Sequence, residues 1–150
     1  MRRRIYLMKL VYEVFAEYNK ARTKEDRISI LKKNDSWALK DIIRGILDEK
    51  IEWNIPDGTP PYTPAPPHST PSNLLKQNVK FKHFVKGGTG DKLPSVKREK
   101  IYLELLESVH PEDAKLVIAM ISKEKPVRQL TKPIVHEAFP GLIPGFPADG

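Results

Sequence analysis

Two basic connections in the chain carry side chains that suit contacts with a phosphate backbone. The first is LKKND at 31–35, and the second is KEKPVRQLTK at 123–132. Their candidate contacts are Lys32, Lys33, Asn34, Lys125, Arg128, Thr131 and Lys132. Each connection leads into a predicted helix, whose first amides have no partner within the helix and attract anions. We therefore expect the two connections to grip two DNA backbones across one groove.

The stretch KFKHFVKGG at 80–88 offers another kind of contact, because it interleaves phenylalanine with lysine. In one interpretation, Phe81 and Phe84 form a platform on which bases stack while the lysines pair with phosphates. On a helix, however, both rings fall on one face, which is typical of a buried side. We therefore favour a core position for the rings and phosphate contacts for the lysines. These lysines are Lys80, Lys82 and Lys86.

No arrangement of side chains in the sequence indicates catalysis. Cysteine is absent, and GGTGDK at 87–92 lacks the order of glycine, lysine and hydroxyl that a Walker phosphate loop requires. The histidines are isolated and lack the spacing of a metal site. They are His68, His83, His110 and His136. We predict a protein that is not an enzyme and that uses no cofactor and no metal.

The net charge of +7 is concentrated in two blocks of the chain. Residues 1–33 contain ten Lys or Arg against four acids, and residues 73–100 contain eight against two. Such blocks suit a polyanionic partner, and the alternative is a solvated surface that keeps the protein soluble. The apolar runs are far too short for a membrane span. We expect a nucleic acid, and not a membrane, as the partner.

Apolar residues recur at helical spacing in the first third of the chain, which predicts three helices. The first covers about residues 4–21, the second follows a cap at Thr23, and the third is WALKDIIRGIL, capped by Asp35 or Ser36. In the third helix we expect Trp37 to face inward with the apolar residues that follow it. These residues are Leu39, Ile42, Ile43, Ile46 and Leu47.

The rest of the chain predicts one extended segment, one long loop and more helices. The alternation in IEWNI at 51–55 suits a short extended segment, and the seven prolines of 56–71 suit a proline-rich surface loop. The further predicted helices run from Ser72 or Asn73 to Val85, from Ser95 or Val96 to Val109, from Pro111, and from Thr131 to about Phe139. We predict one compact all-α domain over residues 1–150, with a flexible tail at 145–150.

The order of these segments resembles the N-terminal DNA-binding domain of ATP-dependent DNA ligases of T-even-type bacteriophages. The matching pieces are ISILKKNDSWALKDIIRGILDEKIEWNI at 28–55, FKHFVKG at 81–87 and DAKLVIAMISKEKPVRQLTKPIVHEAFPGLIP at 113–144. The chain is also similar to small proteins of T-even-like phages that infect cyanobacteria, which carry a similar KNDSWAL, proline loop and FVKGG. The resemblance implies an all-helical domain that lies along the minor groove of nicked duplex DNA.

The chain departs from the ligases in the motif that carries their chemistry. Ligases use a Lys-x-Asp-Gly motif whose lysine takes the adenylate, and this motif does not occur here. The final PADG contains Asp149 and Gly150 but has no lysine two positions before Asp149. The resemblance therefore implies DNA binding without the ligase reaction.

Our first hypothesis is a non-catalytic, phage-encoded protein that grips the backbone of double-stranded DNA, intact or nicked, without strong sequence preference. It would act in the cytoplasm of the infected host cell. The alternative is a protein-interaction module that binds a phage or host replication or transcription protein through the same scaffold, because a fold does not imply a retained function. A virion component is the third hypothesis.

Overall fold

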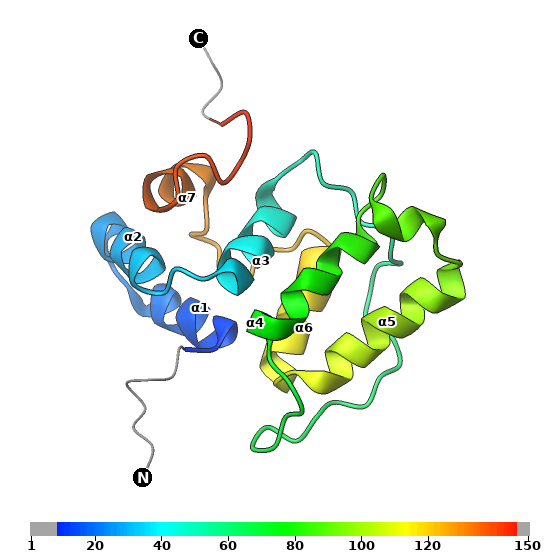
Figure 1. Cartoon of the computed structure of the whole chain (residues 1–150). Coiled ribbons are helices and arrows are strands. Elements are labelled where there is room, and N and C mark those ends of the chain that lie inside the picture. Colours follow the sequence, from blue (N-terminus) through cyan, green and yellow to red (C-terminus); the bar gives the residue numbers. More distant parts are fainter. Residues whose placement is uncertain (1–8, 147–150) are drawn as a thin grey trace.

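Helix α3 (Trp37–Leu47) lies between two groups of helices in the computed structural model, which describes residues 9–146 (Figure 1). The first group is α1 (Val11–Lys20), α2 (Lys24–Lys33) and α7 (Lys132–Ala138). The second group is α4 (Leu74–Gln77), the 3₁₀ segments η2 (Asn78–Phe84) and η3 (Thr89–Lys92), α5 (Ser95–Ser108) and α6 (Pro111–Ile121). Residues 9–146 thus form one all-helical domain without a named strand, which confirms the predicted fold class.

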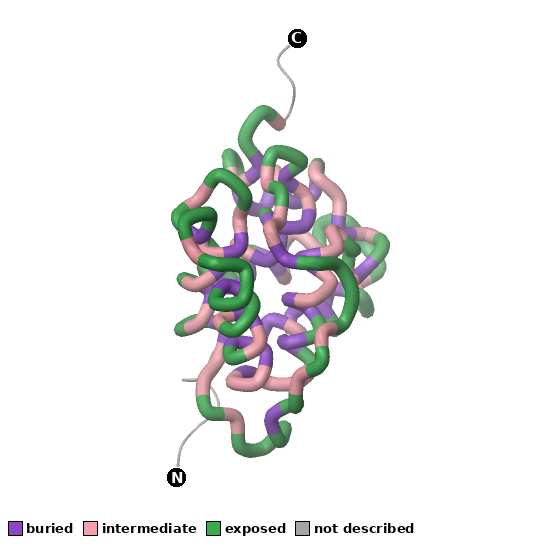
Figure 2. The backbone as a smooth tube through the Cα atoms, turned by 90° about the vertical axis from the view of Figure 1, so that its right-hand side faces the viewer, coloured by how far each residue is buried: buried purple, intermediate pink, exposed green. Residues whose placement is uncertain are grey.

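One hydrophobic core joins the two groups. Leu39, Ile42 and Ile43 of α3 are fully buried, and they belong to a cluster that includes residues of α1, α5, α6 and α7. Figure 2 shows buried residues along the interior and exposed residues on the outer turns. The Tyr18 hydroxyl of α1 donates to the carbonyl of Gln129 at 2.8 Å, which fixes the connection before α7. The core and this bond therefore hold α1 beside a segment that lies 111 positions further along the chain.

Helix α1 begins later than the sequence predicts. The expected start near residue 4 lies outside the described residues, and residues 9 and 10 precede the helix. Leu10 has an extended backbone, and its amide donates to the Glu13 carboxylate at 2.8 Å. The prediction that the first helix includes Leu10 is therefore wrong. The Leu10 amide precedes the first turn, and the Glu13 side chain accepts its hydrogen bond.

Three predicted helix starts are confirmed. Thr23 Oγ1 accepts the Asp26 amide at 3.1 Å before α2, and Ser36 Oγ accepts the Leu39 amide at 3.1 Å before α3. Pro111 occupies the first turn of α6, where its missing amide hydrogen costs nothing. These features are confirmed because a cap depends only on residues within one turn.

The predicted inward position of Trp37 is wrong. The Trp37 side chain is 66% exposed, whereas Leu39 and Ile42 of the same helix are buried. The physical reason is the helical angle, since two residues along the helix correspond to a rotation of about 200°. Trp37 therefore shares a face with Asp41 and Arg44, four and seven residues further on.

Residues 73–85 do not form the single helix that we predicted. Four residues of α-helix are followed by the 3₁₀ segment η2, which ends at Val85 in extended backbone. Val85 forms an isolated antiparallel bridge with Trp53, and Asn54 donates its amide to the Phe84 carbonyl at 2.6 Å. This pairing confirms the extended segment at 51–55. It also explains why the helical turns stop at Phe84, because Val85 has an extended backbone and pairs with Trp53.

The proline-rich loop and the C-terminal residues both lie against the helices. The Thr63 amide donates to Glu107 of α5 at 2.8 Å, and Ala65 of the loop is buried. Ile143 is buried after α7, and Phe146 packs against the core with its ring 5.9 Å from that of His136. The flexible tail predicted at 145–150 stays a prediction, because residues 147–150 lie outside the described part.

The buried Asp113 should make stability depend on pH. Its side chain is 1% exposed, Oδ1 accepts the Tyr12 amide at 2.9 Å, and burial raises its pKa from 3.8 to about 6. Because the folded pKa is the higher one, Asp113 favours folding most when protonated, and this contribution is lost as the pH rises from about 4 to about 6. The neutral Asp113→Asn removes this loss.

Urea unfolding of both proteins at several pH values checks this prediction. We take the free energy of unfolding of Asp113→Asn minus that of wild type. This difference should be larger at pH 7 than at pH 4 by about 2 to 3 kcal/mol. Taking the difference between two pH values cancels any constant cost of the new amide group. Parallel pH curves for the two proteins would contradict the buried, ionised carboxylate.

Candidate binding surface

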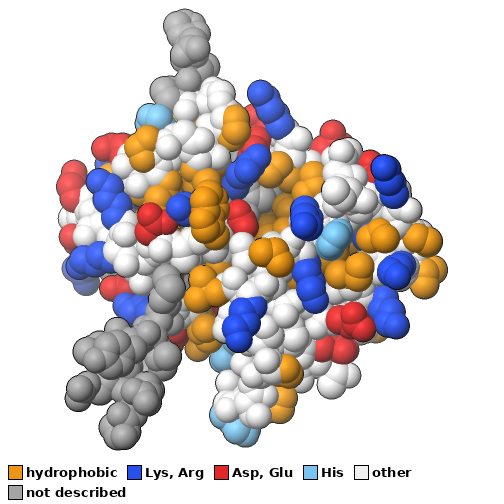
Figure 3. Space-filling view, viewed as in Figure 1, with side chains coloured by type: hydrophobic (Ala, Val, Ile, Leu, Met, Phe, Trp, Pro, Cys, Tyr) orange, Lys and Arg blue, Asp and Glu red, His pale blue; other side chains and the backbone are white. Residues whose placement is uncertain are grey.

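The lysines of α4, η2 and η3 and of the first turn of α5 form a basic surface, which we call the lysine face. It consists of Lys76, Lys80, Lys82, Lys86, Lys92 and Lys97. Figure 3 shows Lys and Arg side chains spread over the α4 to α5 half of this view. Among residues 9–146, only Lys86 of this set has an acidic partner, with Nζ 3.9 Å from Glu52. The remaining charges are free to meet an anion.

Two buried rings turn the lysines outward. Phe81 and Phe84 are 5% and 0% exposed, which confirms their predicted core position. Phe81 packs edge-on against Trp53, and Phe84 packs edge-on against Tyr102 of α5. Because η2 buries its rings on one side, Lys82 extends into solvent on another. The rings therefore position the lysine face and are not themselves available for stacking.

Asp91, within the η3 segment that carries Lys92, uses both carboxylate oxygens for hydrogen bonds inside the fold. Asp91 Oδ2 accepts the Gly87 amide at 2.7 Å, and Oδ1 accepts the Asn54 side chain at 3.3 Å. Gly90 lies so close to the His83 carbonyl that a side chain would overlap the backbone there. The GGTGDK connection is thus a packed turn between helices. Gly90 allows this close contact between two backbone segments, which agrees with the absence of the Walker pattern.

Arg98 belongs to the basic block by sequence but not to the lysine face. Its side chain is 9% exposed, and its guanidinium donates to three backbone carbonyls. These are Asn54 O at 3.0 Å, Gly90 O at 3.0 Å and Leu93 O at 3.1 Å. Arg98 therefore holds the extended segment, η3 and the start of α5 together beneath the lysines, and it cannot reach a ligand.

The stretch 31–35 contains the last three residues of α2, which ends at Lys33, and the first two residues of the turn to α3. Asn34 does not point toward a ligand, because its Nδ2 donates to the Ile30 carbonyl at 2.8 Å and closes the end of α2. Lys32 and Lys33 are exposed. Two of the three candidate contacts of this turn are thus accessible.

The connection at 123–132 meets the other end of α3. Lys123 Nζ donates to the carbonyl of Asp48, which caps α3, at 2.7 Å, and Lys132 forms an ion pair of 3.4 Å with Glu49. Lys125 and Arg128 are exposed on either side of the buried Val127. The two basic segments lie next to opposite ends of α3, while α7, which begins at the end of 123–132, packs against α2. The grip of two backbones across one groove stays a prediction.

Thr131 precedes α7 without acting as a side-chain cap. The helix begins at Lys132, as predicted, but the hydroxyl of Thr131 accepts no hydrogen bond from the first turn. Lys125 Nζ lies 3.3 Å from the carbonyl of Arg128, within the same connection. Charges in this turn thus contact their own backbone or the end of α3.

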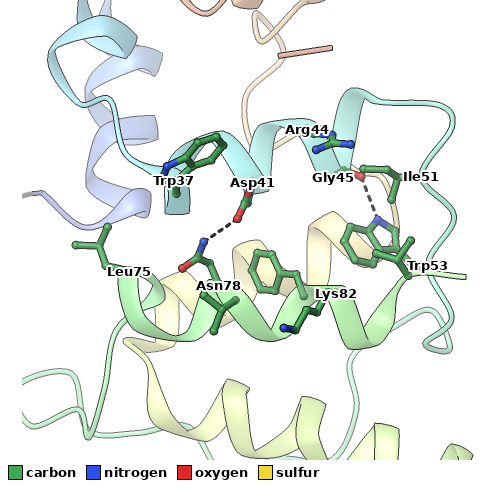
Figure 4. A pocket seen from close by; sticks show the side chains of 12 residues that line it. Trp37, Asp41, Arg44, Gly45, Ile51, Trp53, Leu75, Asn78 and Lys82 are labelled. Atoms are coloured by element: carbon green, nitrogen blue, oxygen red, sulfur yellow. Dashed lines mark hydrogen bonds between the residues drawn. The ribbon is translucent and has the colours of Figure 1, made fainter. Parts of the chain in front are cut away.

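A groove between α3 and the α4–η2 segment adjoins the lysine face (Figure 4). Its volume is about 520 Å³. The lining residues are Trp37, Asp41, Arg44, Gly45, Ile51, Trp53, Leu75, Asn78, Val79, Phe81, Lys82 and Val85. Trp37 and Trp53 lie toward opposite ends, and Asn78 and Asp41 face each other between them. Lys82 belongs to both surfaces.

The groove combines exposed apolar side chains with a polar pair. Trp37, Leu75 and Val79 are exposed by 66%, 46% and 61%. Asn78 Nδ2 donates to Asp41 Oδ2 at 2.7 Å. Burial raises the pKa of Asp41, and the Asn78 hydrogen bond opposes this shift together with the charges of Arg44 and Lys40. The carboxylate is thus held in place by neighbours that favour its charged form.

Sequence reasoning missed this groove, although part of its signal was present. Trp37, Asp41 and Arg44 follow the spacing of one helix face, opposite the apolar stripe of α3. The facing wall comes from Leu75 and Asn78, more than thirty residues further along the chain. No local pattern indicates that these two walls meet.

No group of three His, Asp or Glu within residues 9–146 is arranged to hold a metal ion. No helix in the same range has the length and apolar character needed to cross a bilayer.

Comparison with known proteins gives a match to one protein family. Residues 14–127 match a family described as "Family of unknown function (DUF6433)". The matched region contains the whole lysine face and every residue that lines the groove. No curated protein and no solved structure matches the sequence.

Replacing Arg98 tests whether it supports the lysine face. Arg98→Met fills the space of the aliphatic stem but leaves three buried carbonyls without a donor, and we expect it to lower the free energy of unfolding by about 3 kcal/mol. Urea denaturation followed by circular dichroism measures this loss. Lys97→Met, at the exposed neighbouring position, is the control and should change stability by less than about 0.5 kcal/mol. Equal effects of the two changes would contradict the assigned role.

Proposed function

The chain is a member of the DUF6433 family, whose function is unknown, and we propose that it is a non-catalytic protein that binds double-stranded DNA through the lysine face. One observation carries this proposal. Five of the six lysines on this surface have no acidic partner among residues 9–146, and the nearby Asp91 uses both carboxylate oxygens within the fold. Lysines without an acidic partner can neutralise phosphates, and the counterions that are then released from the DNA favour binding.

The chemistry of this surface suits the DNA backbone better than the base edges. Lysine is a flexible point charge, whereas sequence readout in the major groove uses bidentate groups such as arginine or asparagine. The one arginine within the block, Arg98, is buried. We therefore propose binding to intact or nicked duplex without strong sequence preference, with an affinity that falls steeply with salt.

The resemblance to phage ligase DNA-binding domains supports the same proposal. It suggests a phage protein that acts in the cytoplasm of the infected host cell. The candidate contacts outside the lysine face have a lesser part in this scheme. They are Lys32, Lys33, Lys125, Arg128, Thr131 and Lys132, which add to the overall positive potential and so to the rate of encounter.

A second candidate function is protein interaction, and the groove favours it. Trp37, Leu75 and Val79 are three exposed large apolar side chains along one groove, and exposed apolar patches with a polar rim mark interaction sites. The partner would be a phage or host replication or transcription protein, or a virion component.

Binding of a fluorescent duplex, followed by anisotropy, tests the proposal. We expect the affinity to fall by a factor of at least about 100 between about 50 mM and about 200 mM salt. The triple variant Lys76→Gln, Lys80→Gln and Lys97→Gln should lower the slope of log affinity against log salt by roughly 2 to 3, because each lost phosphate contact removes about 0.9. Lys82 is kept so that the groove is unchanged.

The matched control removes two charges that do not belong to the lysine face. Lys125→Gln with Arg128→Gln should change the slope by less than about 1, because these side chains are not part of the proposed contact surface. Absence of duplex binding at low salt would refute the proposed function. An equal loss in the control would refute the assignment to the lysine face.

A further inference from the structure

Trp37 is an aromatic surface that the fold does not use. Its side chain is 66% exposed, while Phe81 and Phe84 of the neighbouring segment are buried. The Lys40 ammonium lies over one face of the indole, 4.2 Å from the ring centre, and Asp35 holds that ammonium at 2.8 Å. A ring fixed in this way, with most of its surface in solvent, is a platform for stacking.

Positive charges flank this platform on both walls of the groove. Arg44 lies on the α3 wall, seven residues after Trp37, with its Nε 3.4 Å from the Asp48 carboxylate, and Lys82 extends from the opposite wall (Figure 4). Lys82 also belongs to the lysine face. A strand whose phosphates follow the lysine face therefore passes the mouth of the groove. The charge of the rim favours an anionic ligand.

The floor of the groove offers two acceptors and one donor that the fold does not use. One N–H of the Asn78 side-chain amide donates to Asp41 Oδ2, while its second N–H, Asn78 Oδ1 and Asp41 Oδ1 make no hydrogen bond among the described residues. Nucleobases carry amino or imino donors at the edge of a flat ring. The side of a peptide helix presents no free backbone donor, and an acidic peptide adds few donors in its side chains. The acceptors therefore favour a base over an acidic helix.

From this arrangement we infer that the groove between α3 and the α4–η2 segment receives an unpaired base of single-stranded DNA, stacked on Trp37. The Asn78–Asp41 pair accepts hydrogen bonds from the edge of the base, and Arg44 and Lys82 contact the adjacent phosphates. The inference rests on the proposed DNA binding. It deepens that function, because it names single-stranded or locally opened DNA as a ligand beside the duplex.

Titration of the full chain with oligothymidylate tests the inference. Thymine has one imino donor, and stacking on an indole quenches its fluorescence. The chain has two tryptophans, Trp37 and Trp53, and the Trp53 indole donates to the Gly45 carbonyl at 3.0 Å. In Trp37→Phe only Trp53 remains, so the difference between wild type and this variant gives the signal of Trp37. We expect quenching in wild type and its loss in Trp37→Phe.

Affinity provides a second measurement. Trp37→Ala should weaken oligothymidylate binding by about 5-fold to about 150-fold, the range for loss of one stacked base, and should leave duplex affinity unchanged. Val96→Ala is the control, because Val96 is a 78% exposed apolar side chain outside the groove. It should change neither affinity. Circular dichroism verifies that the variants fold, as expected for exposed positions.

The outcomes separate this inference from the function on which it rests. Duplex binding that depends on the lysine face, with oligothymidylate binding unaffected by Trp37→Ala, overturns the base site and leaves the proposed function intact. Quenching of Trp37 by an amphipathic peptide of leucine and glutamate, without quenching by oligothymidylate, also overturns it in favour of a protein ligand. Failure to bind either form of DNA refutes both proposals.

Discussion

The burial of one face of α3 is the constraint on which the rest of the structure depends. Leu39, Ile42 and Ile43 pack into the core from the middle of the molecule, with helices on both sides. An α-helix buried along one stripe must present the opposite stripe outward. That outward stripe carries Trp37, Asp41 and Arg44, so the packing that stabilises the domain also forms one wall of the groove.

The other wall depends on how the second group of helices is fastened. Phe81 and Phe84 pack η2 against Trp53 and Tyr102. Arg98 donates hydrogen bonds to three separate backbone segments and so connects them. A buried guanidinium is costly unless its donors are satisfied, and here three carbonyls satisfy it. The basic residues of 73–100 therefore have two different roles. One arginine stabilises the scaffold, and the lysines around it remain in solvent.

Ion pairing changes how much positive charge a surface presents to an anion. Lys24, Lys40 and Lys132 of the first group of helices and α3 each meet a carboxylate within 4 Å, whereas the exposed Lys32 and Lys33 have no acidic partner among residues 9–146. The lysine face has one such contact, a long one at Lys86. Exposed ion pairs contribute little to stability, yet they lower the positive potential that an anion meets. The lysine face therefore keeps most of its positive charge unpaired.

The amino-acid sequence by itself determined the helical class, the caps at Thr23 and Ser36, the start at Pro111 and the core position of Phe81 and Phe84. These features depend on residues within one or two turns, where local geometry and side-chain chemistry decide the outcome. Tertiary structure alone decided that Arg98 is buried and that the exposed face of α3 meets the α4–η2 segment across a groove. It also joined Asp41 to Asn78 across thirty-seven positions of the chain. Such contacts follow from which helix faces cover one another, and no periodicity within a single helix carries that information.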